Sequence, residues 1–150
     1  MNEIIPNQID FIFIDLKGFF IQNLIVYFNF IVGKKNNHSI GPLISNEKGV
    51  ITLSRELIEK SINKNIIDYP MDYHGTLNDC SHLEIVIFPK KNLERRVDML
   101  KEFFPEISLS FKKMIDTSNN EEIYFYKKFE LPLKNHKIII EVFKKIDIDL

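Results

Sequence analysis

The chain has 150 residues, of which 20 are basic and 21 acidic, so its net charge is −1. Basic and acidic residues are balanced along the whole chain. No basic stripe marks a nucleic-acid surface, and a hydrophobic content of 45% argues against intrinsic disorder. The single cysteine, Cys80, excludes an internal disulfide framework. We expect one domain over residues 1–150, in the reducing cytoplasm of a bacterium, because no signal sequence precedes the first apolar run.

The densest apolar stretch runs from Phe11 to Val32. Its length would allow a membrane span, but Asp15 and Lys17 lie inside it, and a charge at the centre of a bilayer costs about 2.5–3.5 kcal/mol. We therefore expect no membrane association. The run instead predicts two strands, at about 9–16 and 23–32, with a short polar break between them. One face of the second strand is wholly apolar, and it consists of Leu24, Val26, Phe28, Phe30 and Val32.

Turn chemistry predicts a hairpin after these strands. Asn46 and Gly49 occupy the first and fourth positions of a four-residue turn, a pattern typical of a type I turn closed by a left-handed residue. The flanking segments 38–45 and 50–53 are rich in residues that suit extended structure. The two segments are therefore expected to pair with each other.

Two helices are expected, near 55–63 and near 93–104. Ser54 can cap the first helix and Asn92 the second, and apolar residues recur at helical spacing in both. A proline ends the second helix, and the pattern after it leaves 107–115 open between strand and helix.

Three further strands are predicted at 82–88, 123–131 and 137–146, from alternating apolar residues bounded by prolines or polar turns. Strands therefore dominate, and short turns join the sequential ones. This organisation predicts a mainly β fold with α additions: an antiparallel β-sandwich of the transthyretin-like or Ig-like kind, with two helices attached.

Two short turn motifs near the N-terminus carry a family resemblance. The first is Asp15–Gly18 (DLKG), which leads to a second strand beginning at Asn23–Val26; the second is Ser45–Gly49 (SNEKG). Together they resemble the opening of transthyretin-like, or prealbumin-like, domains of the carboxypeptidase regulatory type, although that family prefers Thr-Asp where this chain has Ser-Asn. The resemblance covers about residues 9–53 and extends to the strand at 82–88. It implies a seven- or eight-stranded sandwich that serves as a binding or structural module.

One branch of that fold, the 5-hydroxyisourate hydrolases, is enzymatic. Its members use His and Arg residues and end in a Tyr-Arg-Gly-Ser motif, whereas this sequence ends in Ile146–Leu150 (IDIDL) and has no histidine in its first strand. No catalytic residue is carried over from the family. We accordingly predict no enzymatic activity and no cofactor.

His74, Cys80 and His82 could form a soft metal site. Cys80 and His82 share a face if their segment is a strand, and His74 could approach from the loop before them. The alternative, which we favour, is a buried cysteine beside ordinary surface histidines. A Cys80–His nucleophilic pair is a weaker hypothesis, because nothing in the sequence fixes a base beside the thiol.

The loop at 68–75 is the most distinctive in composition, because two Asp-Tyr pairs flank a Pro-Met step. Rigid aromatic rings beside carboxylates suit a protein interface. The favoured alternative is that the apolar members cover one end of the core while the aspartates cap turns. The candidate binding residues are Asp68, Tyr69, Met71, Asp72 and Tyr73.

A local basic cluster consists of Lys90, Lys91, Arg95 and Arg96. It could touch phosphate, but acidic residues are interspersed with it and a solvated helix face is the favoured interpretation.

With no catalytic motif, the leading functional hypothesis is a non-enzymatic protein-binding module, for example a cytoplasmic protein of the toxin-immunity kind. The alternative is a structural subunit of a larger assembly or a homo-oligomer, because both faces of the strand that begins at Phe11 are apolar. A small hydrolase of the same fold is the third hypothesis. The expected partner is thus another protein or a second copy of the chain, and not nucleic acid or a membrane.

Overall fold

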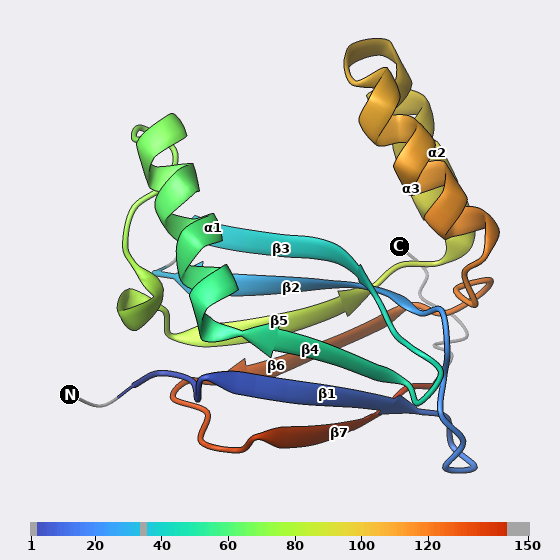
Figure 1. Ribbon diagram of the computed structural model, residues 1–150, viewed down its shortest axis with the longest axis horizontal. Coiled ribbons are helices and arrows are strands. Elements are labelled where there is room, and N and C mark those ends of the chain that lie inside the picture. The colour runs from blue at the N-terminus through green and yellow to red at the C-terminus, as the bar shows by residue number, and fades with distance from the viewer. Residues whose placement is uncertain (1–2, 34–35, 144–150) are drawn as a thin grey trace.

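A computed structural model describes residues 3–33 and 36–143, and within these ranges the chain forms a mixed, sheet-rich fold with two sheets and three α-helices. One sheet has four strands in the order β3-β2-β5-β6, and the other has three in the order β4-β1-β7. Figure 1 shows both sheets, with the helices rising from one side. The strands are β1 (Gln8–Ile14), β2 (Ile25–Val32), β3 (Asn36–Ile44), β4 (Val50–Ser54), β5 (His82–Ile87), β6 (Phe125–Glu130) and β7 (Lys137–Glu141). The helices are α1 (Arg55–Asp68), α2 (Lys90–Phe103) and α3 (Pro105–Asp116), with a 3₁₀ turn at Leu77–Asp79.

Strand pairing is antiparallel in the four-stranded sheet and between β1 and β4, as predicted. The β1–β7 pair is parallel, with Phe11 opposite Ile138 and Phe13 opposite Ile140. The prediction of a wholly antiparallel arrangement is therefore wrong at this pair. Parallel strands need a long crossover connection, and here almost the entire chain separates the two strands, so no local turn signal could reveal the pairing.

The two sheets share one hydrophobic core. The rings of Phe11 on β1 and Phe28 on β2 lie with centroids 5.1 Å apart, which brings the inner faces of the sheets together. The predicted apolar face of the second strand is confirmed, because Leu24, Val26, Phe28 and Phe30 are fully buried in this core. Each such side chain contributes roughly 1.5–3 kcal/mol on burial.

The Asn46–Gly49 turn forms as predicted. The Gly49 N–H donates to the Asn46 carbonyl at 2.9 Å, and the Asn46 side-chain oxygen accepts the N–H groups of Lys48 and Val50. Gly49 has a φ of 72°, and a Cβ there would come within 2.5 Å of the Phe13 carbonyl oxygen, so only glycine fits. The predicted hairpin is nevertheless wrong, because β3 pairs with β2 while β4 pairs with β1. The turn carries the chain from one sheet to the other.

Helix α1 contacts β3 and β4, the neighbouring edges of the two sheets. Ser54 caps it as predicted, with its hydroxyl oxygen accepting the Leu57 N–H at 3.1 Å. The helix extends to Asp68, beyond the expected end near 63, and it buries Ile58 and Ile62 in the main core. It therefore covers the main core at these two edges, at the end of β4 that lies away from the Asn46–Gly49 turn (Figure 1).

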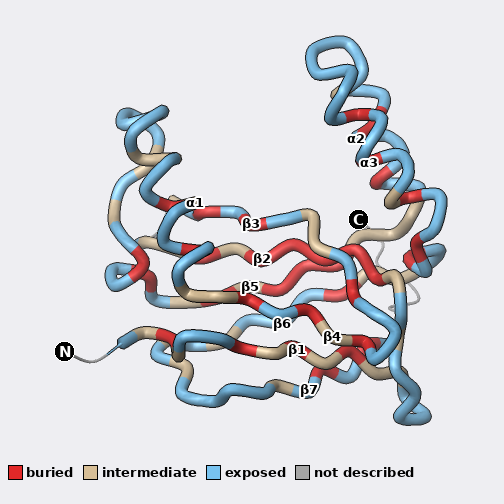
Figure 2. The backbone as a smooth tube through the Cα atoms, in the orientation of Figure 1, coloured by how far each residue is buried: buried red, intermediate tan, exposed pale blue. Residues whose placement is uncertain are grey.

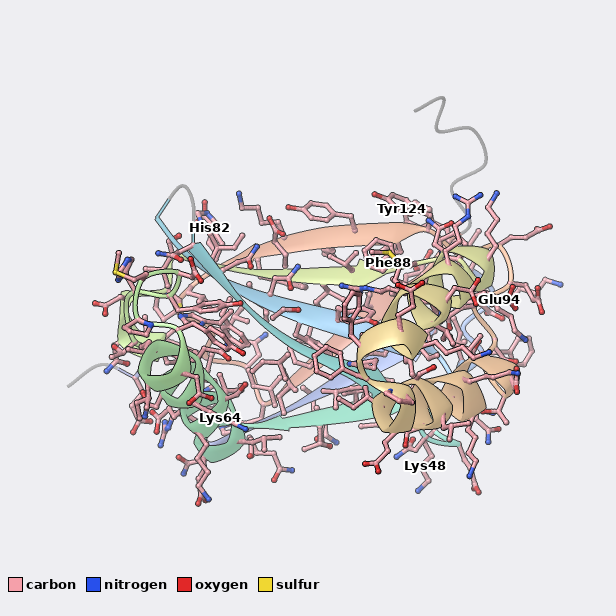
Figure 3. The ribbon with its side chains drawn as sticks, turned by 90° about the horizontal axis from the view of Figure 1, so that it is seen from above. Lys48, Lys64, His82, Phe88, Glu94 and Tyr124 are labelled. Carbon is pink, nitrogen blue, oxygen red and sulfur yellow. The ribbon has the colours of Figure 1, made fainter. Side chains whose placement is uncertain are left out.

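Helices α2 and α3 stand at the other end of the four-stranded sheet (Figures 1 and 3). Helix α2 begins at Lys90, three residues before the expected start, and Pro89 rather than Asn92 precedes it as the cap residue. The open segment 107–115 is helical, so the fold has three α-helices where two were expected.

The three later strands appear close to their predicted positions. Ile140 and Val142 are buried, as the alternation predicted, and Ile138 packs against the same core. Residues 144–146 of the last predicted strand lie outside the described residues. In the described ranges no helix is both long and apolar enough to cross a membrane.

Candidate functional site: the helical hairpin and the sheet surface at its foot

Helices α2 and α3 form a hairpin with a small core of its own. This core lies on the outer face of the four-stranded sheet, on the side of β2 that faces away from the main core. The sheet contributes Ile25, Tyr27 and Val86, and the helices contribute Leu93, Val97, Phe111 and Ile115. Strand β2 is thus buried on one face by the other sheet and, at its beginning, on the opposite face by the hairpin.

The far end of the hairpin is apolar and exposed. Pro105 at the first position of α3 allows the second helix to begin two residues after the first one ends, because its missing N–H is not needed there. Figure 2 shows that the buried part of the hairpin does not extend to its far end. The exposed apolar side chains, which we call the hairpin tip, are Met99 (72% exposed), Phe103 (74%), Phe104, Ile107 and Leu109.

Asn120 attaches the foot of the hairpin to the sheet. Its side chain is fully buried, and its amide nitrogen donates to the carbonyls of Ile25 (3.0 Å) and Phe88 (3.1 Å). Its side-chain oxygen accepts the Ile25 N–H at 2.9 Å, and its backbone carbonyl accepts the Lys90 N–H at 2.6 Å. One residue therefore ties together the start of β2, the end of β5 and the start of α2.

Arg96 and Tyr27 meet where α2 crosses the sheet. The Arg96 guanidinium lies 5.0 Å from the centroid of the Tyr27 ring, within the range of a cation–π interaction. Burial raises the pKa of Tyr27, and the nearby Arg96 charge partly offsets that rise. Phe88 packs edge-on against Tyr27 and in turn against Tyr124, and Figure 3 shows Phe88 and Tyr124 at the foot of the hairpin.

Two hollows flank this pair, and both are lined by Tyr27 and Arg96. The polar hollow has a volume of about 270 Å³ and the apolar hollow about 430 Å³. The polar hollow is completed by Asn29, Ser39, Phe88, Asn92 and Leu93. The apolar hollow is completed by Gly41, Pro42, Leu100, Ile107, Ser110, Phe111 and Met114.

An irregularity in β3 shapes the apolar hollow. The register between β2 and β3 shifts at Tyr27, so that Gly41 and Pro42 together lie opposite this one residue. Proline is tolerated there because β3 is an edge strand and the bulge interrupts its ladder. A Cβ on Gly41 would lie 3.2 Å from the Tyr27 ring, so glycine lets the strand approach the ring closely.

The basic cluster predicted at the start of α2 does not act as one group. The Lys90 ammonium forms an ion pair with Glu121 at 3.4 Å, and Lys91 and Arg95 are exposed. Arg96 has no carboxylate within ion-pair distance among the residues that the structure describes. Arg96 is the member of the cluster that lies against Tyr27, and its charge has no described carboxylate partner.

The candidate binding loop at 68–75 divides into an exposed and a packed part. Asp68 ends α1, while Tyr69, Met71 (87% exposed) and Asp72 face solvent. Tyr73 instead stacks on the fully buried ring of His38 at 5.3 Å, which supports the alternative of a cover over the core for this residue. Binding by the loop stays a prediction.

His38 itself was not singled out from the sequence. Its Nε2 lies 3.2 Å from the Gly75 carbonyl, and its Nδ1 is buried without a hydrogen-bond partner among the described residues. The stacked pair of His38 and Tyr73 holds the loop against β3.

The candidate metal residues do not form a ligand cluster. No group of three or more His, Cys, Asp or Glu side chains in 3–33 and 36–143 is arranged to hold a metal ion. The buried Cys80 thiol donates to the Thr76 carbonyl at 3.5 Å, His82 Nδ1 pairs with the Ser81 hydroxyl at 2.8 Å, and His74 is exposed. Burial, with a smaller contribution from Asp79, raises the pKa of Cys80 to about 11, which is the opposite of what an activated nucleophile needs.

Comparison with known proteins gave no match to a protein family, a curated protein or a solved structure. Function is therefore inferred from the structure of the chain alone.

Sequence reasoning missed Tyr27, Asn120 and the exposed apolar end of the hairpin. Tyr27 lies on the other face of the second strand, where apolar and polar residues alternate as Ile25, Tyr27, Asn29 and Ile31. That mixture is the available signal, because a face with both kinds of residue is typical of a partly covered surface. Phe103 and Phe104 beside a proline were likewise visible as an apolar end without a partner.

Proposed function

We propose that the chain is a non-enzymatic protein-binding module of the cytoplasm and that the hairpin tip is its binding element. The observation that carries this proposal is the set of apolar side chains at the tip, which stand away from both cores. Phe and Met are enriched at protein interfaces, and a helical hairpin presents them on a rigid support. A soluble partner, as in the toxin-immunity kind of complex, would cover them.

The hairpin tip contributes little to the stability of the isolated chain. Phe103 is 74% exposed and Met99 is 72% exposed, so most of their apolar area remains in water. Burying side chains of this size against a partner would contribute roughly 1.5–3 kcal/mol each. The same residues in a monomer carry only the risk of aggregation, which favours a physiological partner.

The finer fold assignment is part of the same proposal: an antiparallel β-sandwich of the transthyretin-like type, with α1 and the hairpin as additions. Two sheets around one core support it. The first turn motif also has the expected local chemistry, because the Asp15 carboxylate accepts the N–H groups of Lys17 and Phe19. The parallel β1–β7 pair is a departure from the simplest version.

Affinity capture with a matched pair of variants tests the proposed function. The tip variant carries Met99→Gln and Phe103→Gln; the control carries Leu57→Gln and Ile67→Gln, two exposed apolar residues of α1. We expect a partner from the native host to be retained by the wild type and the control and lost by the tip variant, with melting temperatures unchanged. Retention of the same partner by the tip variant would contradict the proposal.

A second candidate function, a homo-oligomer or structural subunit, is supported by the outer face of the three-stranded sheet. Val50, Ile12 and Ile139 lie side by side in one row across it, and Ile139 is 64% exposed. This agrees with the expectation that both faces of the first strand are apolar. Sedimentation of the wild type beside Ile139→Lys tests it: a wild-type dimer that becomes a monomer supports the candidate, and a wild-type monomer at high concentration contradicts it.

A further inference from the structure

We propose that the polar and apolar hollows beside Arg96 form a single binding site for a carboxylate carried on an apolar group. This site goes beyond the proposed function, because it lies between the sheet and the hairpin and shares only Ile107 with the hairpin tip; Met99 and Phe103, which the tip variant changes, do not line it.

The charge of Arg96 determines the sign of the ligand. No described carboxylate pairs with it, and the remaining residues that line the two hollows are all uncharged. Lys90, at the start of the same helix, is paired with Glu121. The Tyr27 ring lies 5.0 Å from the guanidinium, and the two side chains also share a hydrogen bond. These contacts restrain the guanidinium and leave its remaining N–H groups for a ligand. A guanidinium in neutral surroundings favours an anion.

The neutral groups around Arg96 favour a carboxylate over a phosphate. Asn29, Ser39 and Asn92 supply amide and hydroxyl groups to the polar hollow but no second positive charge. One guanidinium matches the charge and the planar two-oxygen geometry of one carboxylate, with two parallel N–H···O bonds. A phosphate dianion would retain uncompensated charge in this hollow.

The apolar hollow determines what the carboxylate is attached to. It is lined by Pro42, Leu100, Ile107, Phe111 and Met114, and its volume of about 430 Å³ lies within the range of small-ligand pockets. Because Tyr27 and Arg96 border both hollows, a carboxylate at Arg96 places an attached apolar group along the Tyr27 ring and into the apolar hollow. The shared chemistry is that of an apolar C-terminal residue of a peptide or of a free organic acid with a hydrophobic tail.

Titration of the full chain followed by backbone NMR shifts tests the site. The probes are N-acetylphenylalanine, as an analogue of a peptide C-terminus, and 3-phenylpropionate, as a free acid. N-acetylphenylalanine amide removes the charge from the first probe, and inorganic phosphate tests the anion class. We expect saturable shifts at Tyr27, Asn29 and Gly41 with both acids, and at least tenfold weaker binding of the amide and of phosphate. Tighter binding of either acid supports the site and identifies its source of carboxylate.

Three variants test whether the acids bind at Arg96 and in the apolar hollow. Arg96→Gln should weaken both acids at least tenfold, while Arg95→Gln, its exposed neighbour on α2, should not. Ser110→Leu leaves Arg96 in place but occupies part of the apolar hollow, and it should weaken the phenyl probes severalfold. Equal binding of the acid and the amide, or unchanged binding by Arg96→Gln, overturns the proposal. The tip variant should bind the acids normally, so failure here and failure of the hairpin tip to bind a partner are independent results.

Discussion

The two helical arms of this protein rise on the same side of the four-stranded sheet, at its opposite ends, but they are built differently (Figures 1 and 3). Helix α1 sends Ile58 and Ile62 into the main core between the sheets. The α2–α3 hairpin packs on a separate, smaller cluster and ends in exposed apolar side chains. The first arm closes the core, whereas the second adds a surface that the sheets themselves do not need.

We expect α1 to matter chiefly for stability and the hairpin chiefly for the proposed binding. Residues that complete a main core are constrained by packing, and their removal affects every element. A hairpin on a satellite cluster can lose stability locally while the sheets persist, and the same arrangement suits binding elements in general.

The largest effect is expected from matched isoleucines, one in each arm. Ile62 on α1 and Ile115 on α3 are both essentially buried, but Ile62 belongs to the main cluster and Ile115 to the hairpin cluster. Ile62→Ala should lower the free energy of unfolding by about 3–5 kcal/mol, and Ile115→Ala by about 2–3 kcal/mol, because the smaller cluster can collapse into the cavity more readily. Urea unfolding of both variants measures the two values.

Hydrogen exchange shows which part of the chain each of the two isoleucine variants destabilises. Ile115→Ala should accelerate exchange in 90–116 and leave β2 and β5 protected, while Ile62→Ala should accelerate exchange in both sheets. Equal losses of stability with equal, global changes in exchange would show that the hairpin is no separate unit, and the comparison between the arms would be wrong.

The next effect concerns the attachment of the hairpin. Asn120→Ala removes three buried hydrogen bonds of the side chain and leaves both backbone groups of Ile25 and the Phe88 carbonyl without this partner. Orphaned buried polar groups cost about 1–3 kcal/mol each, so we expect a loss of about 2–3 kcal/mol after local relaxation. Asn119→Ala, at its exposed neighbour, is the control and should cost less than about 1 kcal/mol. Thermal unfolding of the two variants measures both losses. A similar loss of stability for Asn119→Ala and Asn120→Ala would contradict the role of Asn120 in attaching the hairpin.

The contrast between the arms also explains what the sequence could and could not reveal. Periodicity identified the faces of β2, the cap at Ser54 and the turn at Asn46–Gly49, because each depends on residues only a few positions apart. The partners of Asn120 lie 95 residues away at Ile25 and 32 away at Phe88, and no local pattern encodes them. For the same reason the turn was visible, but its role as a passage between two sheets was not.

The candidate site at the foot of the hairpin was harder to predict, because it is formed by residues that are distant in the sequence. Arg96 belonged to a recognised basic cluster, but only the packing of α2 onto β2 brings it over Tyr27 and gives it a different role from Arg95. Cys80 shows the opposite case. The favoured interpretation of a small buried residue agrees with its place in the main core, because burial dominates its environment.

Cys80 provides a pH test of the core that α1 helps to close. Burial raises its pKa from 9.0 to about 11, so the folded state favours the neutral thiol and the unfolded chain ionises first. The resulting stability is fully present below about pH 9 and is lost as the pH rises toward 11. Linkage gives a decrease of about 2 kcal/mol between pH 8 and pH 10.5. Cys80→Ala should lack this decrease in urea unfolding at a series of pH values; parallel curves for the two proteins would contradict the prediction.

The smallest effects are expected where the two arms are most alike, at their exposed apolar ends. Phe103→Ala in the hairpin tip and Ile67→Ala near the end of α1 remove side chains that are 74% and 76% exposed. Each should change the free energy of unfolding by less than about 0.5 kcal/mol, because little buried area is lost. Urea unfolding of the isolated chain measures this, and a loss above 1 kcal/mol for Phe103→Ala alone would mean that the tip is packed within the monomer. If stability is unchanged in both arms while only Phe103→Ala impairs partner capture, the exposed apolar surface of the hairpin is functional and that of α1 is incidental.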